Sequence, residues 1–133
     1  MIKPKEAYYA PYKIIASDFD GTLFVDAYPD VGEPIFATIN RLKEEQANGA
    51  KAILWTNREG EELEKAVKAC KAVGIQFDAV NDNLPDIIKN FGSNPRKVFA
   101  NEYWDDRMVF LPYIKHPDGA NVGVYVYEPP QLK

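Results

Sequence analysis

Cysteine and histidine are almost absent from the sequence. Among its 133 residues Cys70 is the only cysteine and His116 the only histidine. One cysteine cannot form an internal disulfide, and the first residues lack the apolar segment of a signal peptide, so the expected compartment is the cytoplasm. Cys70 lies on an apolar helical stripe and is expected to pack in the core. His116, between Lys115 and Pro117, is expected to lie in a solvated loop.

Positive charge is also scarce. The chain has 16 Lys and Arg against 20 Asp and Glu, which gives a net charge of −4. No basic block is present to follow a nucleic-acid backbone, so broad nucleic-acid binding is not expected. No apolar stretch approaches the length of a membrane span, and no segment repeats. Hydrophobic residues nevertheless make up 46% of the chain, so we expect one core and a single domain over residues 1–133.

The apolar segments alternate between patterns typical of strands and patterns typical of helices. Strands are predicted over residues 12–17, 52–55, 75–80, 98–104 and 122–127. Helices are predicted from Pro34, as the first helical residue, to Gly49, from an N-cap at Asn57 to Gly74, and over residues 85–90. This order predicts an α/β fold: a mainly parallel sheet with helices on both faces, as in a Rossmann-like three-layer sandwich.

Polar side chains follow three of the predicted strands. They are Asp18 and Asp20 after the first strand, Thr56 and Asn57 after the second, and Asp105 and Asp106 after the fourth. In an open parallel sheet the active crevice lies beyond the carboxyl ends of the strands. We therefore expect these side chains to surround one site.

The spacing of Asp18 and Asp20 places both carboxylates on one face of an extended chain, with Phe19 on the other. Like charges this close repel each other unless a cation or a shared proton lies between them. The pair is therefore a candidate for binding a divalent ion, or for dividing the roles of nucleophile and acid. The alternative is a pair of solvated turn carboxylates before Gly21.

Two segments carry a resemblance to a known family. Residues 18–23, Asp-Phe-Asp-Gly-Thr-Leu, resemble the first motif of phosphatases of the haloacid dehalogenase superfamily, and residues 53–57, Ile-Leu-Trp-Thr-Asn, resemble the second. The resemblance extends to Arg107 and implies a Mg²⁺-dependent phosphatase. It implies that Asp18 accepts the phosphoryl group, that Asp20 acts as general acid and base, and that Thr56 donates its hydroxyl to the phosphate.

The resemblance also implies the remaining site residues. Asn57 would contact the phosphate beside Thr56, and Asp105 and Asp106 would hold the metal together with Asp18 and Asp20. A physical argument supports an ion here, because an anionic nucleophile must approach an anionic phosphate. The alternative roles are structural. Thr56 could simply end a strand, with its hydroxyl on a backbone carbonyl, and Asp105 and Asp106 could cap a helix or lie on a solvated turn.

The cation of the third motif is less clearly marked. Lys97 is the candidate for catalysis and phosphate binding, with Lys89 and Arg96 as alternatives. Arg58 could pair with Glu59, Glu61 or Glu62 or touch the phosphate. In the same region Asn101 and Glu102 are unusual for a central parallel strand, which we expect to be bent or short there.

The intervals between the motifs leave no space for a cap domain. The resemblance is therefore to the small capless type, with a site that is open unless residues 24–34 or another subunit of a homo-oligomer covers it. The expected partner is a phosphorylated substrate of unknown identity. Two alternatives are a phospho-accepting signalling module like a receiver domain, which does not share the spacing of Asp18 and Asp20, and a binding protein of the same fold without turnover.

Overall fold

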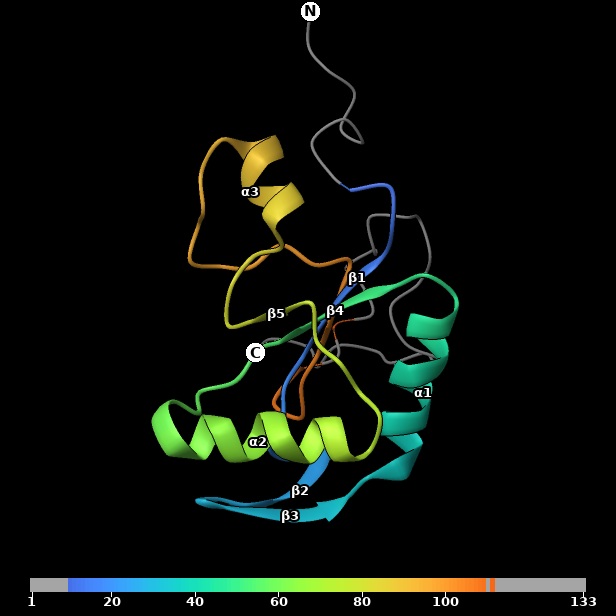
Figure 1. Ribbon diagram of the computed structural model, residues 1–133, viewed down its shortest axis with the longest axis vertical. Coiled ribbons are helices and arrows are strands. Elements are labelled where there is room, and N and C mark those ends of the chain that lie inside the picture. The colour runs from blue at the N-terminus through green and yellow to red at the C-terminus, as the bar shows by residue number, and fades with distance from the viewer. Residues whose placement is uncertain (1–9, 110, 112–133) are drawn as a thin grey trace, which may run out of the picture.

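The computed structural model describes residues 10–109 and 111 (Figure 1). Four parallel strands form a sheet in the order β5-β4-β1-β6. These are β1 (Ile14–Ser17), β4 (Lys51–Leu54), β5 (Ala79–Val80) and β6 (Glu102–Trp104). Two antiparallel strands, β2 (Phe24–Ala27) and β3 (Asp30–Pro34), form a hairpin. The helices are α1 (Phe36–Ala47), α2 (Gly60–Ala72) and α3 (Pro85–Phe91).

Both faces of the sheet are covered. On one face Ile15 packs in a buried cluster with residues of α1 and α2, including Cys70. On the other face Ile14 and Ala16 pack with residues of α3, including Ile87. This explains why β1 is apolar throughout, since a central parallel strand is buried on both sides. The predicted parallel α/β arrangement and the core position of Cys70 are confirmed.

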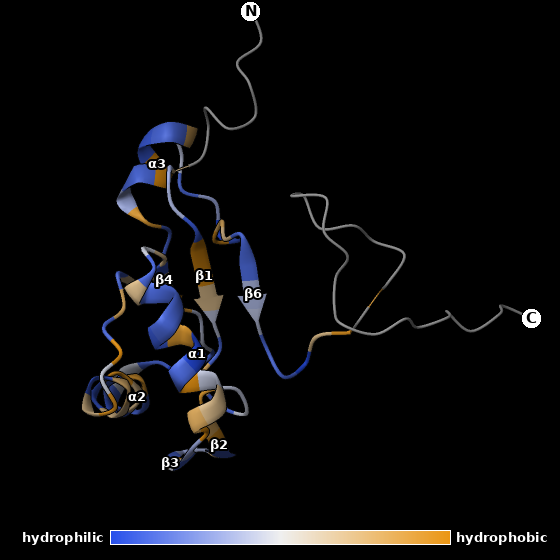
Figure 2. Ribbon diagram, turned by 90° about the vertical axis from the view of Figure 1, so that its right-hand side faces the viewer, coloured by the Kyte–Doolittle hydropathy of each residue, from blue (hydrophilic) through white to orange (hydrophobic). Residues whose placement is uncertain are grey.

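The β2–β3 hairpin, predicted from the sequence as a loop, lies beyond the carboxyl ends of β1 and β6 (Figure 2). Pro34 pairs with Phe24 as the last residue of β3, and the Ile35 N–H donates to the Leu23 carbonyl at 2.8 Å. The prediction that Pro34 begins a helix is therefore wrong. The chain stays extended through Pro34 because it is part of the hairpin ladder, and α1 begins at Phe36.

Two further boundaries differ from the predictions. Helix α2 begins at Gly60 with Glu59 as the N-cap, so the predicted cap at Asn57 is wrong. The third predicted strand is reduced to the two residues of β5. The predicted strand over 122–127 and His116 lie outside the described residues. No helix in the described part of the chain is long and apolar enough to span a membrane.

The polar residues in the fourth predicted strand have a local explanation. The strand is short, as expected, and β6 has β1 as its only neighbour within the described sheet. Asn101 lies just before it and accepts a hydrogen bond from the Ile14 N–H at 2.7 Å. Glu102 forms an ion pair with Lys13 at 2.7 Å. Both polar side chains therefore have partners at this edge of the described sheet.

Candidate active site

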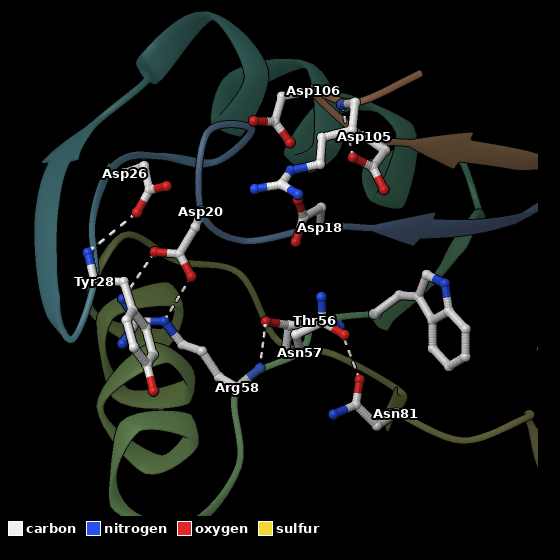
Figure 3. A pocket seen from close by; sticks show the side chains of 12 residues that line it. Asp18, Asp20, Asp26, Tyr28, Thr56, Asn57, Arg58, Asn81, Asp105 and Asp106 are labelled. Carbon is white, nitrogen blue, oxygen red and sulfur yellow. Dashed lines mark hydrogen bonds and ion pairs between the residues drawn. The ribbon is translucent and has the colours of Figure 1, made fainter. Parts of the chain in front are cut away.

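A cavity of about 470 Å³ lies at the carboxyl ends of the parallel strands (Figure 3). It is lined by Asp18, Asp20, Asp26, Tyr28, Trp55, Thr56, Asn57, Arg58, Asn81, Asp105, Asp106 and Arg107. All six polar residues that the sequence places after strand ends therefore line one cavity. The hairpin contributes Asp26 and Tyr28, which the sequence analysis did not identify.

Three of the carboxylates lie close together. One oxygen from each of Asp18, Asp105 and Asp106 lies within 4.8 Å of the others. Their alignment follows from the pairing of β1 with β6, which ends with the Asp18 N–H donating to the Trp104 carbonyl at 2.8 Å. The strand ends thus bring carboxylates together from distant parts of the sequence.

Gly21 allows the carboxylate of Asp106 to lie close to the backbone that follows Asp18. It has a φ of +81°, and a Cβ atom there would collide with the carboxylate of Asp106. Glycine adopts this backbone conformation without the steric penalty that other residues meet. The segment from Asp18 to Gly21 therefore provides one carboxylate of the cluster and the space for another, that of Asp106.

The electrostatics of the cluster favour a cation. Burial, together with the charges of Asp105 and Asp106, raises the pKa of Asp18 from 3.8 to about 7, although a hydrogen bond from the Phe19 N–H opposes the change. Clustered carboxylate oxygens are the donors that Mg²⁺ prefers, usually with retained water molecules. Asp18, Asp105 and Asp106 therefore fit a hard divalent ion.

Thr56 and Asn57 lie on the opposite side of the cavity from the acidic cluster (Figure 3). The Thr56 N–H donates to Asn81 Oδ1 at 2.8 Å, and Thr56 Oγ1 accepts the Arg58 N–H at 3.1 Å. Asn81 has a φ of +51° and follows β5, so it holds the end of β4 from the neighbouring strand. Asn57 is exposed in the cavity.

The carboxylate of Asp20 is turned away from the acidic cluster. It lies against Arg58, with Asp20 Oδ2 to Nε and Asp20 Oδ1 to Nη2 both at 2.8 Å (Figure 3). The Arg58 side chain is 1% exposed, and its hydrogen bonds to Asp20 raise its pKa above the usual value. The sequence predicts a pair of Arg58 with the acidic run of residues 59–62 or a contact with the phosphate. Its ion pair is instead with Asp20.

The three candidate cations of the third motif lie outside the cavity lining. The ammonium of Lys97 is 5.5 Å from the centre of the Tyr103 ring. Lys89 is in the last turn of α3, and Arg96 is exposed. Arg107, which the sequence analysis did not consider, lines the cavity and directly follows the acidic pair. That position was the available signal.

A solved structure shows the family to which the chain belongs. No protein-family model matches it, and no curated protein matches it. A solved structure described as the conserved protein coded by locus from Bacteroides thetaiotaomicron is 39% identical, with a TM-score of 0.66. The match covers 74% of this chain and 78% of that one. The chain belongs to the family of that protein. Family membership supports the fold and assigns no activity.

Proposed function

We propose that the protein is a magnesium-dependent phosphatase of the capless haloacid dehalogenase type, which hydrolyses phosphoric monoesters through a phospho-aspartate at Asp18. One observation carries the proposal: three carboxylates and the Thr56-Asn57 pair face each other across a single cavity at the strand ends. Phosphoryl transfer needs a nucleophile, donors for the phosphate oxygens and compensation of charge, held in fixed positions. The cavity offers candidates for each role.

Asp18 is the nucleophile in this proposal. Its carboxylate oxygen forms a bond to phosphorus while the bond to the ester oxygen breaks, and Asp20, which must be protonated at this step, gives its proton to the leaving oxygen. Thr56 and Asn57 bind the phosphate oxygens. In the second step water attacks phosphorus, Asp20 takes the proton, and phosphate leaves with Asp18 restored.

Asp18, Asp105 and Asp106 would hold the Mg²⁺ ion, which would supply positive charge where these carboxylates meet the phosphate. The carboxylate of Asp20 pairs with Arg58 and lies apart from these three, so Asp20 is not placed among the metal ligands. The resemblance to the haloacid dehalogenase superfamily assigns it to proton transfer. Arg107 is the cavity cation that we assign to the phosphate in place of Lys97, because Arg58 is enclosed and Lys97 lies on Tyr103.

The proposal is tested by rapid mixing with 4-nitrophenyl phosphate and Mg²⁺. The parent protein should release phosphate steadily. Asp20→Asn should give a burst of about one equivalent of nitrophenolate followed by slow turnover, because this leaving group needs no proton whereas the attacking water does. Asp18→Asn should give no burst.

Matched substrates and a control sharpen this test. Asp20→Asn should lose far more activity on an alkyl phosphate than on the nitrophenyl ester. Asp86→Asn removes a carboxylate that accepts a hydrogen bond from Tyr12 outside the cavity and should behave like the parent. A single stoichiometric phosphorylation of the parent would point to a receiver-like module, and no reaction at all would point to a binding protein.

A further inference from the structure

Arg58 uses every donor that it has. Its guanidinium gives Nε–H and one Nη2–H to the two oxygens of Asp20, both at 2.8 Å. Nη1 donates to the carbonyls of Pro29 at 3.1 Å and Glu62 at 3.2 Å, and Nη2 also donates to the carbonyl of Asp30 at 2.5 Å. Since an arginine side chain has five N–H donors, none remains for a substrate.

The same side chain is enclosed by two aromatic rings. The guanidinium carbon lies 4.9 Å from the centre of the Phe19 ring and 5.1 Å from that of Tyr28. Phe19 belongs to the buried core, whereas Tyr28 is on the hairpin. Arg58 therefore connects the core, the loop that carries Asp20 and the turn of the hairpin.

This connection has a geometric consequence for the cavity. Asp20 is 18% exposed and lines the cavity, as do Asp26 and Tyr28 of the hairpin. If Arg58 were absent, the carboxylate would lose its two-pronged contact and the turn would lose the donors to Pro29 and Asp30. Both would become free to move relative to Asp18.

We propose that Arg58 is a positioning residue that fixes the Asp20 carboxylate to the turn of the β2–β3 hairpin, so that the two are held as one unit beside Asp18. The inference rests on the proposed function, because it assigns Arg58 to the proton-transfer residue of that reaction. Arg58 acts through Asp20 and does not touch the substrate.

Hydrogen exchange tests the connection without depending on activity. In Arg58→Gln the amides of β2 and β3 should exchange about tenfold faster or more, because several charge-assisted hydrogen bonds are lost, while those of β1 and β4 keep the parent rates. Asp20→Asn should show a smaller increase at the same amides. Arg41→Gln is the matched control, because it removes an arginine–carboxylate pair with Glu45 on the surface of α1. Hairpin exchange at the parent rate in Arg58→Gln would overturn the proposal.

A double-mutant cycle tests the effect on catalysis. Arg58→Gln should lower kcat for 4-nitrophenyl phosphate by about a hundredfold, because misplaced catalytic groups cost that much, with little change in KM. In the Asp20→Asn background the same substitution should lower kcat by no more than about threefold, since the group through which it acts is already gone. A purely structural role would give equal losses in both backgrounds and would overturn the proposal.

Two results separate the possible failures. If Arg58→Gln does not fold, Arg58→Lys keeps the charge without the two-pronged contact and should show the same changes in exchange and kcat. If the parent releases no phosphate, the proposed function fails, while the exchange measurement still decides whether Arg58 joins Asp20 to the hairpin.

Discussion

Asp20 and the cluster of Asp18, Asp105 and Asp106 line the same cavity and differ in how their charge is balanced. Asp20 is bound on both oxygens by a buried arginine. Asp18, Asp105 and Asp106 gather within 4.8 Å, and no ion pair joins them to another residue in the described part of the chain. The charge of Asp20 is compensated within the fold, whereas no ion pair of the described residues compensates the charge of the cluster. A paired carboxylate and an unpaired cluster side by side indicate a division between residues that are positioned and residues that bind.

Of the changes that test this comparison, removing the charge of the acidic cluster should have the largest effect, on both phosphate release and Mg²⁺ binding. Asp105→Asn with Asp106→Asn should lower phosphate release by about three powers of ten and weaken Mg²⁺ binding in calorimetric titration, because the ion loses two ligands. The parent in excess chelator should be equally inactive. Glu44→Gln with Glu64→Gln removes two exposed helix carboxylates and should change neither property. Turnover that survives chelation would contradict the metal assignment.

Removing Arg107, the cation that we assign to the phosphate, should have the next largest effect on activity. Arg107→Gln should lower kcat/KM by about a hundredfold, comparable with the loss of one preorganised donor. Lys97→Gln should stay within about threefold of the parent, because Lys97 lies on the Tyr103 ring, outside the cavity lining. Steady-state kinetics on 4-nitrophenyl phosphate measure both. The reverse order would restore Lys97 as the third-motif residue.

Gly21 offers a test of how the cluster is built. Gly21→Ala should lower the free energy of unfolding by about 2 kcal/mol through backbone strain and the collision with Asp106, and should weaken Mg²⁺ binding. Gly92→Ala is a matched control, because Gly92 has a φ of +74° with no atom near the added Cβ. It should show the strain alone, about 1 kcal/mol, in denaturant unfolding. Equal effects of the two substitutions would mean that the contact with Asp106 is unimportant.

The smallest effect concerns pH. The folded-state pKa of Asp18 is raised from 3.8 to about 7, so its protonated form stabilises the metal-free protein at low pH, and this contribution is lost as pH rises from about 4 to about 7. Added Mg²⁺ should counter this loss of stability. The increase in Tm that Mg²⁺ produces should therefore be about 3 °C larger at pH 8 than at pH 5.5. Thermal denaturation of the parent and of Asp18→Asn checks this. A pH-independent Mg²⁺ effect would contradict it.

Much of this arrangement could be predicted from the sequence. The apolar segment Ile14 to Ala16 indicates a strand buried on both faces, and polar residues after successive strands indicate a shared edge. These are local patterns with a direct physical meaning. The gathering of Asp18, Thr56 and Asp105 around one cavity follows from them once the strands are parallel.

The differences between the predictions and the structure depend on contacts between residues far apart in the sequence. Pro34 suits a helix start by itself, and only its pairing with Phe24 keeps it in a strand. Arg58 has acidic neighbours in the sequence, yet its carboxylate partner is Asp20, 38 residues away. The prediction for Lys97 rests on its place in the order of motifs, and this order does not specify the direction of its side chain. Partner choice by long side chains is therefore the part that the sequence pattern leaves open.

The pairing of β1 with β6 has a consequence for stability. Along the chain, these are the first and the last strands of the described four-stranded sheet, although they are neighbours within it. Asp18 directly follows β1, and Asp105 directly follows β6. An ion shared by both carboxylates would act as a cross-link that closes a long loop of chain, and such a link restricts the unfolded state more strongly as the loop grows. The chain has a single, buried cysteine. A metal ion bound at this site would therefore restrict the unfolded chain as disulfides do in small secreted domains.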